Sequence, residues 1–108
     1  MSIPVAVADL PATLAGYPWG YIVTVGPALQ AHVLAVPTEY RDGSFHLEGG
    51  RSTRANATER PEVTMVFPSP AAGEYSLVVD GTATVHDDRI LVRPEHAVLH
   101  RPAIAAAE

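Results

Sequence analysis

The residue types best suited to chemistry follow a pair of glycines at positions 49 and 50. Arg51 and Arg54 offer planar guanidinium groups that match a phosphate, and two hydroxyl donors, Ser52 and Thr53, lie between them. The pattern predicts that a helix begins here, and the first backbone N–H groups of a helix have no partner within it. Together with the helix dipole, these groups favour an anion. The segment therefore predicts a site for a phosphate group.

The charge around this segment differs from that of the whole chain. Positions 50–61 hold three arginines and one acid, whereas the 108-residue chain has a net charge of −5 and no lysine. A second interpretation stays open, in which Ser52 or Thr53 caps an ordinary helix. The arginines would then be solvated or would pair with Glu48 and Glu59.

The histidines give a weaker signal for a metal site. His96 and His100 are four residues apart, a spacing with which a helix can present two ligands on one face. No glutamate stands between them in an H-E-x-x-H pattern, and the neighbouring Arg93 and Arg101 would repel a cation. We therefore expect no bound metal.

Several classes of function have no support in the sequence. Without cysteine, the chain has no disulfide, no cysteine zinc site and no cysteine nucleophile. It lacks the G-x-S-x-G, G-x-G-x-x-G and P-loop motifs. There is no basic excess for nucleic acid, no apolar run of the roughly 18 residues that span a bilayer, and no basic start of a signal peptide. We expect a cytoplasmic protein that binds neither nucleic acid nor a membrane.

The elements that must position these residues are mostly short strands. Alternating apolar residues and β-branched side chains predict strands at positions 21–25, 31–36, 44–48, 63–67, 75–79, 82–85 and 89–93. The segment 31–36 is apolar on both faces apart from His32, which predicts a central strand. Positions 41–43 and 86–88 predict turns. Asp80-Gly81 is either a hairpin turn or a bulge within one long strand.

The predicted helices are few and short. Four apolar residues share one helix face, namely Ile3, Val7, Leu10 and Leu14. They predict a helix at about 4–15, which Pro11 interrupts. A second helix is predicted at 54–60, before Pro61, and one or two helical turns at 94–100.

The number of elements fits one mainly β domain over residues 1–108, with a flexible tail from about 103 to 108. A composition of 47% hydrophobic and 18% charged residues is that of a folded chain. Six or seven short antiparallel strands, separated by turns, predict a small barrel or a sandwich.

Five segments carry a resemblance to a known family. They read YIVTV at 21–25, AHVLAV at 31–36, GRSTRAN at 50–56, PEVTMVFP at 61–68 and YSLVVDGTATV at 75–85. In this order, after a short N-terminal helix, the chain resembles the pyridoxamine 5′-phosphate oxidase-like family of flavin-binding split β-barrels. The resemblance covers most of the chain, from about residue 5 to residue 102.

The resemblance implies a cofactor, FMN or the deazaflavin F420, and a homodimer with the cofactor sites at the subunit interface. The residues that match the family's phosphate-holding segment are Arg51, Ser52, Thr53, Arg54 and Asn56. The residues that match the strand end whose backbone lies along the flavin ring are Val36, Pro37 and Thr38. Thr53 stands where many members have lysine, and the set that holds pyridoxal phosphate is missing, so oxidation of vitamin B6 is not expected.

Two classes of function follow from this resemblance. In the first, the chain is a small FMN- or F420-dependent oxidoreductase, in which the cofactor carries the hydride chemistry and no side chain is assigned as acid or base. In the second, the chain binds a flavin or another phosphorylated ligand without turnover, or keeps the split barrel as a dimer without any cofactor.

Overall fold

An antiparallel sheet of eight strands makes up about half of the chain, and the structure, a computed structural model, describes residues 2–103. The elements are β1 (Ser2–Val5), a 3-10 helix η1 (Val7–Asp9), α1 (Leu10–Leu14), β2 (Trp19–Val25), β3 (Ala31–Pro37), β4 (Tyr40–Arg41), β5 (Ser44–Glu48), α2 (Arg51–Glu59), β6 (Glu62–Phe67), β7 (Ser76–His86) and β8 (Arg89–His100). The strand order is β3-β2-β6-β7-β8-β5-β4, and β1 pairs with β8 outside this path.

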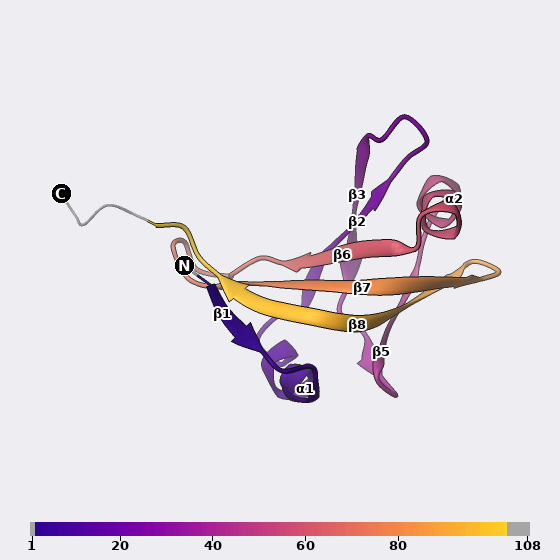
Figure 1. Cartoon of the computed structure of the whole chain (residues 1–108). Coiled ribbons are helices and arrows are strands. Elements are labelled where there is room, and N and C mark those ends of the chain that lie inside the picture. Colours follow the sequence, from indigo (N-terminus) through magenta and orange to yellow (C-terminus); the bar gives the residue numbers. More distant parts are fainter. Residues whose placement is uncertain (1, 104–108) are drawn as a thin grey trace.

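The sheet curls into a split β-barrel (Figure 1). The hairpin of β2 and β3 rises across the long strands β6, β7 and β8, and α2 lies beside the upper part of this hairpin. The curl brings β3, at one edge of the sheet, into contact with β5 near the other edge. The predicted mainly β split barrel is therefore confirmed. Its strands outnumber the predicted six or seven because of β1 and the two-residue β4.

The barrel interior is filled by the inward-facing residues of alternating strands. Along β2, β6 and β7 every second residue is buried, the pattern that one covered sheet face produces. The largest fully buried side chains are Phe45, Phe67, Leu10, Ile22, Met65, Leu77 and Ile90. Phe45 stacks on Phe67 with 5.5 Å between the ring centroids, which joins β5 to β6 through the core.

The first residues differ from the predicted helix at about 4–15. Ser2–Val5 forms β1, which pairs with the end of β8 from Ser2 opposite His100 to Val5 opposite Ala97. The helix α1 begins only at Leu10 and has Pro11 in its first turn, where a proline lacks no hydrogen bond. Leu10 is fully buried as the shared face required, whereas Ile3 is 43% exposed.

The end of the chain differs more strongly from the prediction. Positions 94–100 are not helical, because β8 continues from Arg89 to His100 along the whole length of β7. Of the two alternatives for Asp80-Gly81, a hairpin turn or a bulge, the structure shows the bulge. Asp80 lies opposite His96 and Gly81 opposite Pro94, which leaves Glu95 as the extra residue. The predicted tail lies, from residue 104 onward, outside the described residues.

The turns predicted at positions 41–43 and 86–88 are confirmed. Asp42 and Gly43 both have positive φ, of 55° and 77°, and connect β4 to β5. Asp87 has a φ of 56° at the turn between β7 and β8. Aspartate and glycine tolerate this left-handed region, which matches the twist of the flanking strands.

Candidate functional site

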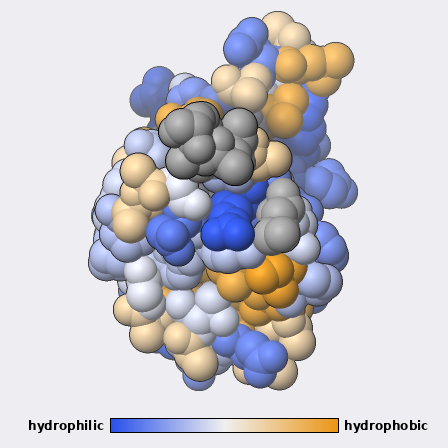
Figure 2. Space-filling view, turned by 90° about the vertical axis from the view of Figure 1, so that its left-hand side faces the viewer, coloured by the Kyte–Doolittle hydropathy of each residue, from blue (hydrophilic) through white to orange (hydrophobic). Residues whose placement is uncertain are grey.

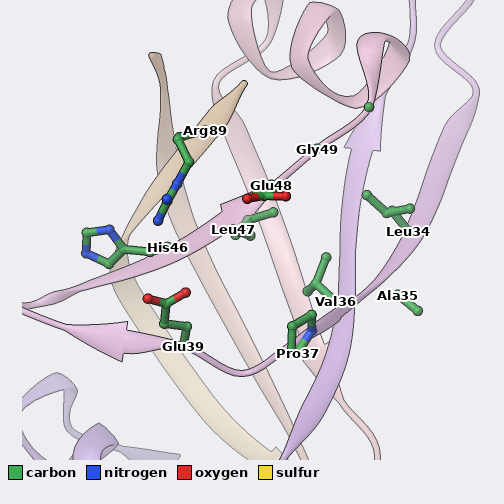
Figure 3. A pocket seen from close by; sticks show the side chains of 11 residues that line it. Leu34, Ala35, Val36, Pro37, Glu39, His46, Leu47, Glu48, Gly49 and Arg89 are labelled. Carbon is green, nitrogen blue, oxygen red and sulfur yellow. The ribbon is translucent and has the colours of Figure 1, made fainter. Parts of the chain in front are cut away.

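A pocket of about 590 Å³ lies where β3 and β5 meet, and we call this place the seam (Figure 3). β3 pairs with β2 on one side only, and β5 beyond Phe45 pairs with β8 on one side only. The pocket is lined by Leu34, Ala35, Val36, Pro37, Glu39, His46, Leu47, Glu48, Gly49, Gly50 and Arg89. The seam is therefore bordered by two strand edges with no strand between them.

The free edge of β3 turns peptide groups toward the seam. At the two ends of the β2–β3 ladder, Gly26 N donates to Gln30 O and Thr38 N donates to Pro18 O. In an antiparallel pair, residues of alternate parity bond to the partner strand, so the even-numbered residues of β3 bond to β2. The N–H and C=O of Ala35 consequently point away from β2, into the seam.

The same reasoning applies to β5. His46 N donates to Glu39 O at 2.9 Å, and Gly49 N donates to Asp88 O at 3.4 Å on the opposite side of the strand. Even-numbered residues of β5 therefore direct their peptide groups away from β8, and Glu48 has no partner strand there. The seam offers main-chain donors and acceptors from both of its walls.

The pocket ends at the start of α2. Gly50 is the N-cap of this helix, and no side-chain hydrogen bond caps it, so the prediction that Ser52 or Thr53 would be the cap is wrong. A methyl group at Gly49 would lie 2.6 Å from Ile90 Cδ1, whereas one at Gly50 would have no atom within 4 Å. The chain thus packs tightly at Gly49 and opens at Gly50, where the first amides of the helix are uncapped.

The positive charges of this helix are available. Arg51 is exposed and Arg54 is half-buried. Within residues 2–103 neither forms an ion pair, so the pairing with Glu48 or Glu59 that the sequence left open does not occur there. The start of α2 therefore combines uncapped amides with two unpaired guanidinium groups, which favours an anion.

Two of the five predicted phosphate residues turn their side chains inward. Thr53 is 1% exposed and lies against Gly49. Asn56 is 8% exposed, and its Nδ2 donates to Thr24 Oγ1 at 3.2 Å. These two side chains fasten α2 to the barrel, whereas Arg51, Ser52 and Arg54 remain on the accessible side.

The three predicted residues at the end of β3 divide in the same way. Val36 and Pro37 line the pocket, with Val36 directed into it (Figure 3). Thr38 does not line it: its Oγ1 donates to Tyr17 O at 2.6 Å and its N to Pro18 O, which ties the end of β3 to the chain before β2. The structure thus brings the predicted strand end and the predicted helix start to one pocket.

The sequence did not predict Glu39, His46 and Arg89 as part of a site. Alternation along positions 44–48 places His46 on the outer face of its strand, and Arg89 is the cross-strand neighbour of Glu48. The positions of His46 and Arg89 relative to β3 depend on how distant strands pair. No local signal in the sequence could therefore have shown that these side chains border the same pocket as Val36.

The histidine pair at 96 and 100 lies elsewhere. His96 Nδ1 is 3.7 Å from Asp80 Oδ2, and His100 Nδ1 is 3.1 Å from Ser2 Oγ, both on the outer side of β8. Residues 2–103 contain no group of three or more potential metal ligands, and within the same range no helix is long and apolar enough to cross a membrane.

Two curated mycobacterial proteins are similar to this chain in sequence. The uncharacterised proteins Mb0449c of Mycobacterium bovis and MT0457 of Mycobacterium tuberculosis are each 38% identical to it over 112 aligned residues. The alignment covers 87% of this chain and 78% of each relative. No protein-family model matches the chain.

Solved structures show the same fold at low sequence identity. A protein of the pyridoxinephosphate oxidase family from Clostridium acetobutylicum superposes with a TM-score of 0.69 at 13% identity, covering 90% of this chain and 91% of its own. A FAD-binding protein of Mesorhizobium loti gives 0.70 at 12% identity, covering 91% and 94%. An F420 reductase gives 0.64 at 19% identity, covering 79% and 93%.

The superposition on these structures agrees with the architecture described above. The chain belongs to the same family as the two uncharacterised mycobacterial proteins, and its fold is that of the pyridoxamine 5′-phosphate oxidase-like split barrels.

Proposed function

We propose that the seam pocket binds a phosphorylated flavin-type cofactor, FMN or F420, and that the chain is a small oxidoreductase. One observation carries this proposal: a single pocket joins the end of β3 at Val36 and Pro37 to the Gly49-Gly50 step into the uncapped helix α2. A flat ring can occupy the seam while its phosphate reaches the helix start. The names of the FAD-binding and F420-dependent fold relatives support the same cofactor class.

The residues present fit such a group. Leu34, Val36 and Leu47 give the pocket apolar walls, and its volume of about 590 Å³ lies within the usual range for small-molecule sites, roughly 300–1,000 Å³. The peptide groups of Ala35 and Glu48 can bond the polar edge of a ring. Arg51 and Arg54 can neutralise a phosphate. When bound, the cofactor would supply the hydride chemistry, while this chain binds and orients it.

A titration of the purified chain with FMN and with F420, followed by absorbance and fluorescence, tests the proposal. Saturable binding of either cofactor is expected, and oxidation of NADPH by the loaded protein would distinguish an oxidoreductase from a binding protein. If neither cofactor binds at concentrations well above those of its cellular pool, the proposed function is wrong.

We also propose that the chain is a homodimer, with the cofactor site beside the interface. The outer face of β2 and β3 is apolar over both strands and consists of Trp19, Tyr21, Val23, Val25, Ala31, Val33, Ala35 and Pro37. Val33 is 55% exposed and Trp19 is 45% exposed. Contiguous exposed apolar surface of this kind usually marks an interaction site. A hollow of about 330 Å³ on this face shares the lining residues Ala35, Val36 and Pro37 with the seam pocket, so the two lie next to each other.

The hairpin carries further apolar surface at its end. Leu29, in the turn between β2 and β3, is 76% exposed. Seen from the left-hand side of Figure 1, hydrophobic residues stand out at the projecting top of the molecule, where that turn lies (Figure 2). This turn belongs to the hairpin but not to the outer face of the two strands, which makes it a suitable control position.

The substitution Val33→Glu is expected to convert the dimer to a monomer, because it places a charge in the middle of the proposed apolar interface. Light scattering after size-exclusion chromatography measures the mass. Leu29→Glu adds the same charge to the same hairpin and is expected to leave the dimer intact. A wild-type chain that elutes as a monomer at tens of micromolar would contradict the dimer proposal.

The substitution Ala35→Pro is expected to weaken cofactor binding without unfolding the sheet, since it deletes an N–H that points into the seam and not a bond to β2. A proline is tolerated on an edge strand in this orientation. The lost hydrogen bond should cost about 0.5–1.5 kcal/mol of binding free energy. Val33→Pro, with the same parity but outside the pocket, is the control. Because Ala35 and Val33 both lie in the proposed interface, the mass of each variant is measured as well, and equal losses of cofactor binding from two dimeric variants would rule out a role for the Ala35 amide.

A further inference from the structure

The seam pocket has a second polar end, away from α2, that the proposed cofactor does not explain. Glu39, His46 and Arg89 line this end and come from the segment before β4, from β5 and from β8. In the close-up view these three side chains lie on one side of the pocket, and Val36 lies on the other (Figure 3). Charged groups from three separate segments at one end of a pocket suggest a subsite of its own.

The imidazole of His46 is held in a defined orientation. Its Nε2 lies 3.2 Å from the carbonyl oxygen of Arg41, and because a carbonyl can only accept, Nε2 is the nitrogen that donates. In the neutral ring, Nδ1 is then an acceptor, and no residue within 2–103 hydrogen-bonds to it. Arg89 lines the same pocket as this ring.

The guanidinium of Arg89 has no acidic partner in the range 2–103, although Glu48 lies directly across the strand pair from it. Instead it extends along the pocket toward His46 (Figure 3). Glu39, the other carboxylate at this end, already pairs with Arg41, with 3.2 Å between Oε2 and Nε. Arg89 is thus the available cation of this end of the pocket.

These groups select a narrow class of ligand. A guanidinium binds a carboxylate through two parallel N–H donors, and the free Nδ1 of His46 accepts a hydrogen bond from a neighbouring hydroxyl. The carboxylate of Glu39 lies at this end of the pocket and disfavours a phosphate or a polycarboxylate there. Leu34, Val36 and Leu47 favour an apolar remainder.

We propose that this end of the seam pocket binds a small 2-hydroxy monocarboxylate, with its carboxylate on Arg89 and its hydroxyl on His46. The binding itself does not depend on a cofactor. The ligand's role as the substrate that meets the cofactor ring rests on the proposed function.

Three related probes test the proposal on the full chain without added cofactor, by calorimetry or by NMR chemical shifts. Mandelate has both polar groups and an apolar ring, phenylacetate lacks the hydroxyl, and mandelamide lacks the charge. Mandelate is expected to bind most tightly, with mandelamide weaker by about tenfold or more, since hydrogen bonds to a charged group are the strong ones. Equal affinity for all three probes, or no saturable binding of any, would overturn the proposal.

Two substitutions assign the contacts. Arg89→Gln is expected to weaken mandelate and phenylacetate alike, by about tenfold or more. Its control is Arg93→Gln, which removes the same charge from the same face of β8, outside the pocket and next to Glu95 at 3.5 Å. Equal losses from the two variants would show a general charge effect and contradict a contact with Arg89.

His46→Gln separates a ligand contact from a structural role. The glutamine amide can still donate to the Arg41 carbonyl, but it places no acceptor where Nδ1 lies, so the preference for mandelate over phenylacetate is expected to vanish while phenylacetate binding stays within about twofold. His86→Gln, on the same outer face but outside the pocket, should leave the preference unchanged. A preference retained in His46→Gln would exclude this role of His46.

The outcomes of the two proposals can be told apart. Titration with FMN and F420 tests the cofactor, and the three probes test the 2-hydroxy acid subsite in its absence. If a cofactor binds but the three probes bind equally well, only the subsite proposal is wrong. If the probes are discriminated but no cofactor binds, only the cofactor proposal is wrong.

Discussion

The substitution Arg54→Ala is expected to weaken the binding of FMN by about 1.5–3 kcal/mol, roughly ten- to a hundredfold, and to leave the binding of riboflavin unchanged. The two ligands share their ring and differ in the phosphate, which we place at the start of α2. Arg54 lies one turn into this helix, half-buried, and forms no ion pair within residues 2–103. Its charge is therefore free to act on a phosphate. Fluorescence titration of both ligands measures the difference.

The control for Arg54 lies on the same helix. Arg60→Ala removes the same charge at the opposite end of α2, where Arg60 is the C-cap and the helix dipole disfavours an anion. FMN affinity is expected to stay within about twofold in this variant. Equal losses of FMN and riboflavin in Arg54→Ala would show that Arg54 does not contact the phosphate.

The substitution Gly81→Ala is expected to lower the free energy of unfolding by about 1–3 kcal/mol. A methyl group at this position would lie 2.4 Å from the carbonyl oxygen of Arg93 and 2.9 Å from Val92 Cγ1. The carbonyl of Arg93 is a backbone group in the longest strand pair of the sheet. It cannot move aside without disturbing the bulge between Asp80 and Gly81. Thermal denaturation measures the effect, at roughly 4–8 °C of Tm for each kcal/mol.

A second glycine provides the comparison. A methyl group at Gly16, after α1, would have a single neighbour, Thr13 O at an ordinary 3.9 Å, so Gly16→Ala should change stability by no more than about 0.5 kcal/mol. If Gly81→Ala proved as stable as Gly16→Ala, the tight approach of β7 and β8 at the bulge would be contradicted.

The sequence predicted local features well. The turn at Asp42-Gly43, the strand Ser44–Glu48 and the helix after the two glycines all follow from residues that are neighbours in the chain. The helix was predicted at 54–60 and begins three residues earlier, at Arg51, because Gly50 is its N-cap. The proposed phosphate segment could be identified for the same reason, because the first amides of the helix and the nearby arginines belong to one helix turn. Such signals need no knowledge of which strands pair.

Features that depend on pairing were missed. Positions 31–36 are apolar on both faces, which predicted a central strand, yet β3 is an edge strand of the sheet. Its apolar outer face stays uncovered within residues 2–103 and is the surface that we propose a second copy covers, which would produce the same sequence pattern as burial inside a sheet. The predicted helical turns at 94–100 failed because β7 provides a partner along the whole of β8, and Pro94 sits at a bulge where a strand tolerates it.

The pairing of β1 with the end of β8 has a practical consequence. Ser2 lies opposite His100, at the end of the molecule away from α2 (Figure 1). A label or a surface attachment placed at Ser2 or at His100 therefore lies far from the seam, and the chain can be immobilised there with its pocket still open to small molecules.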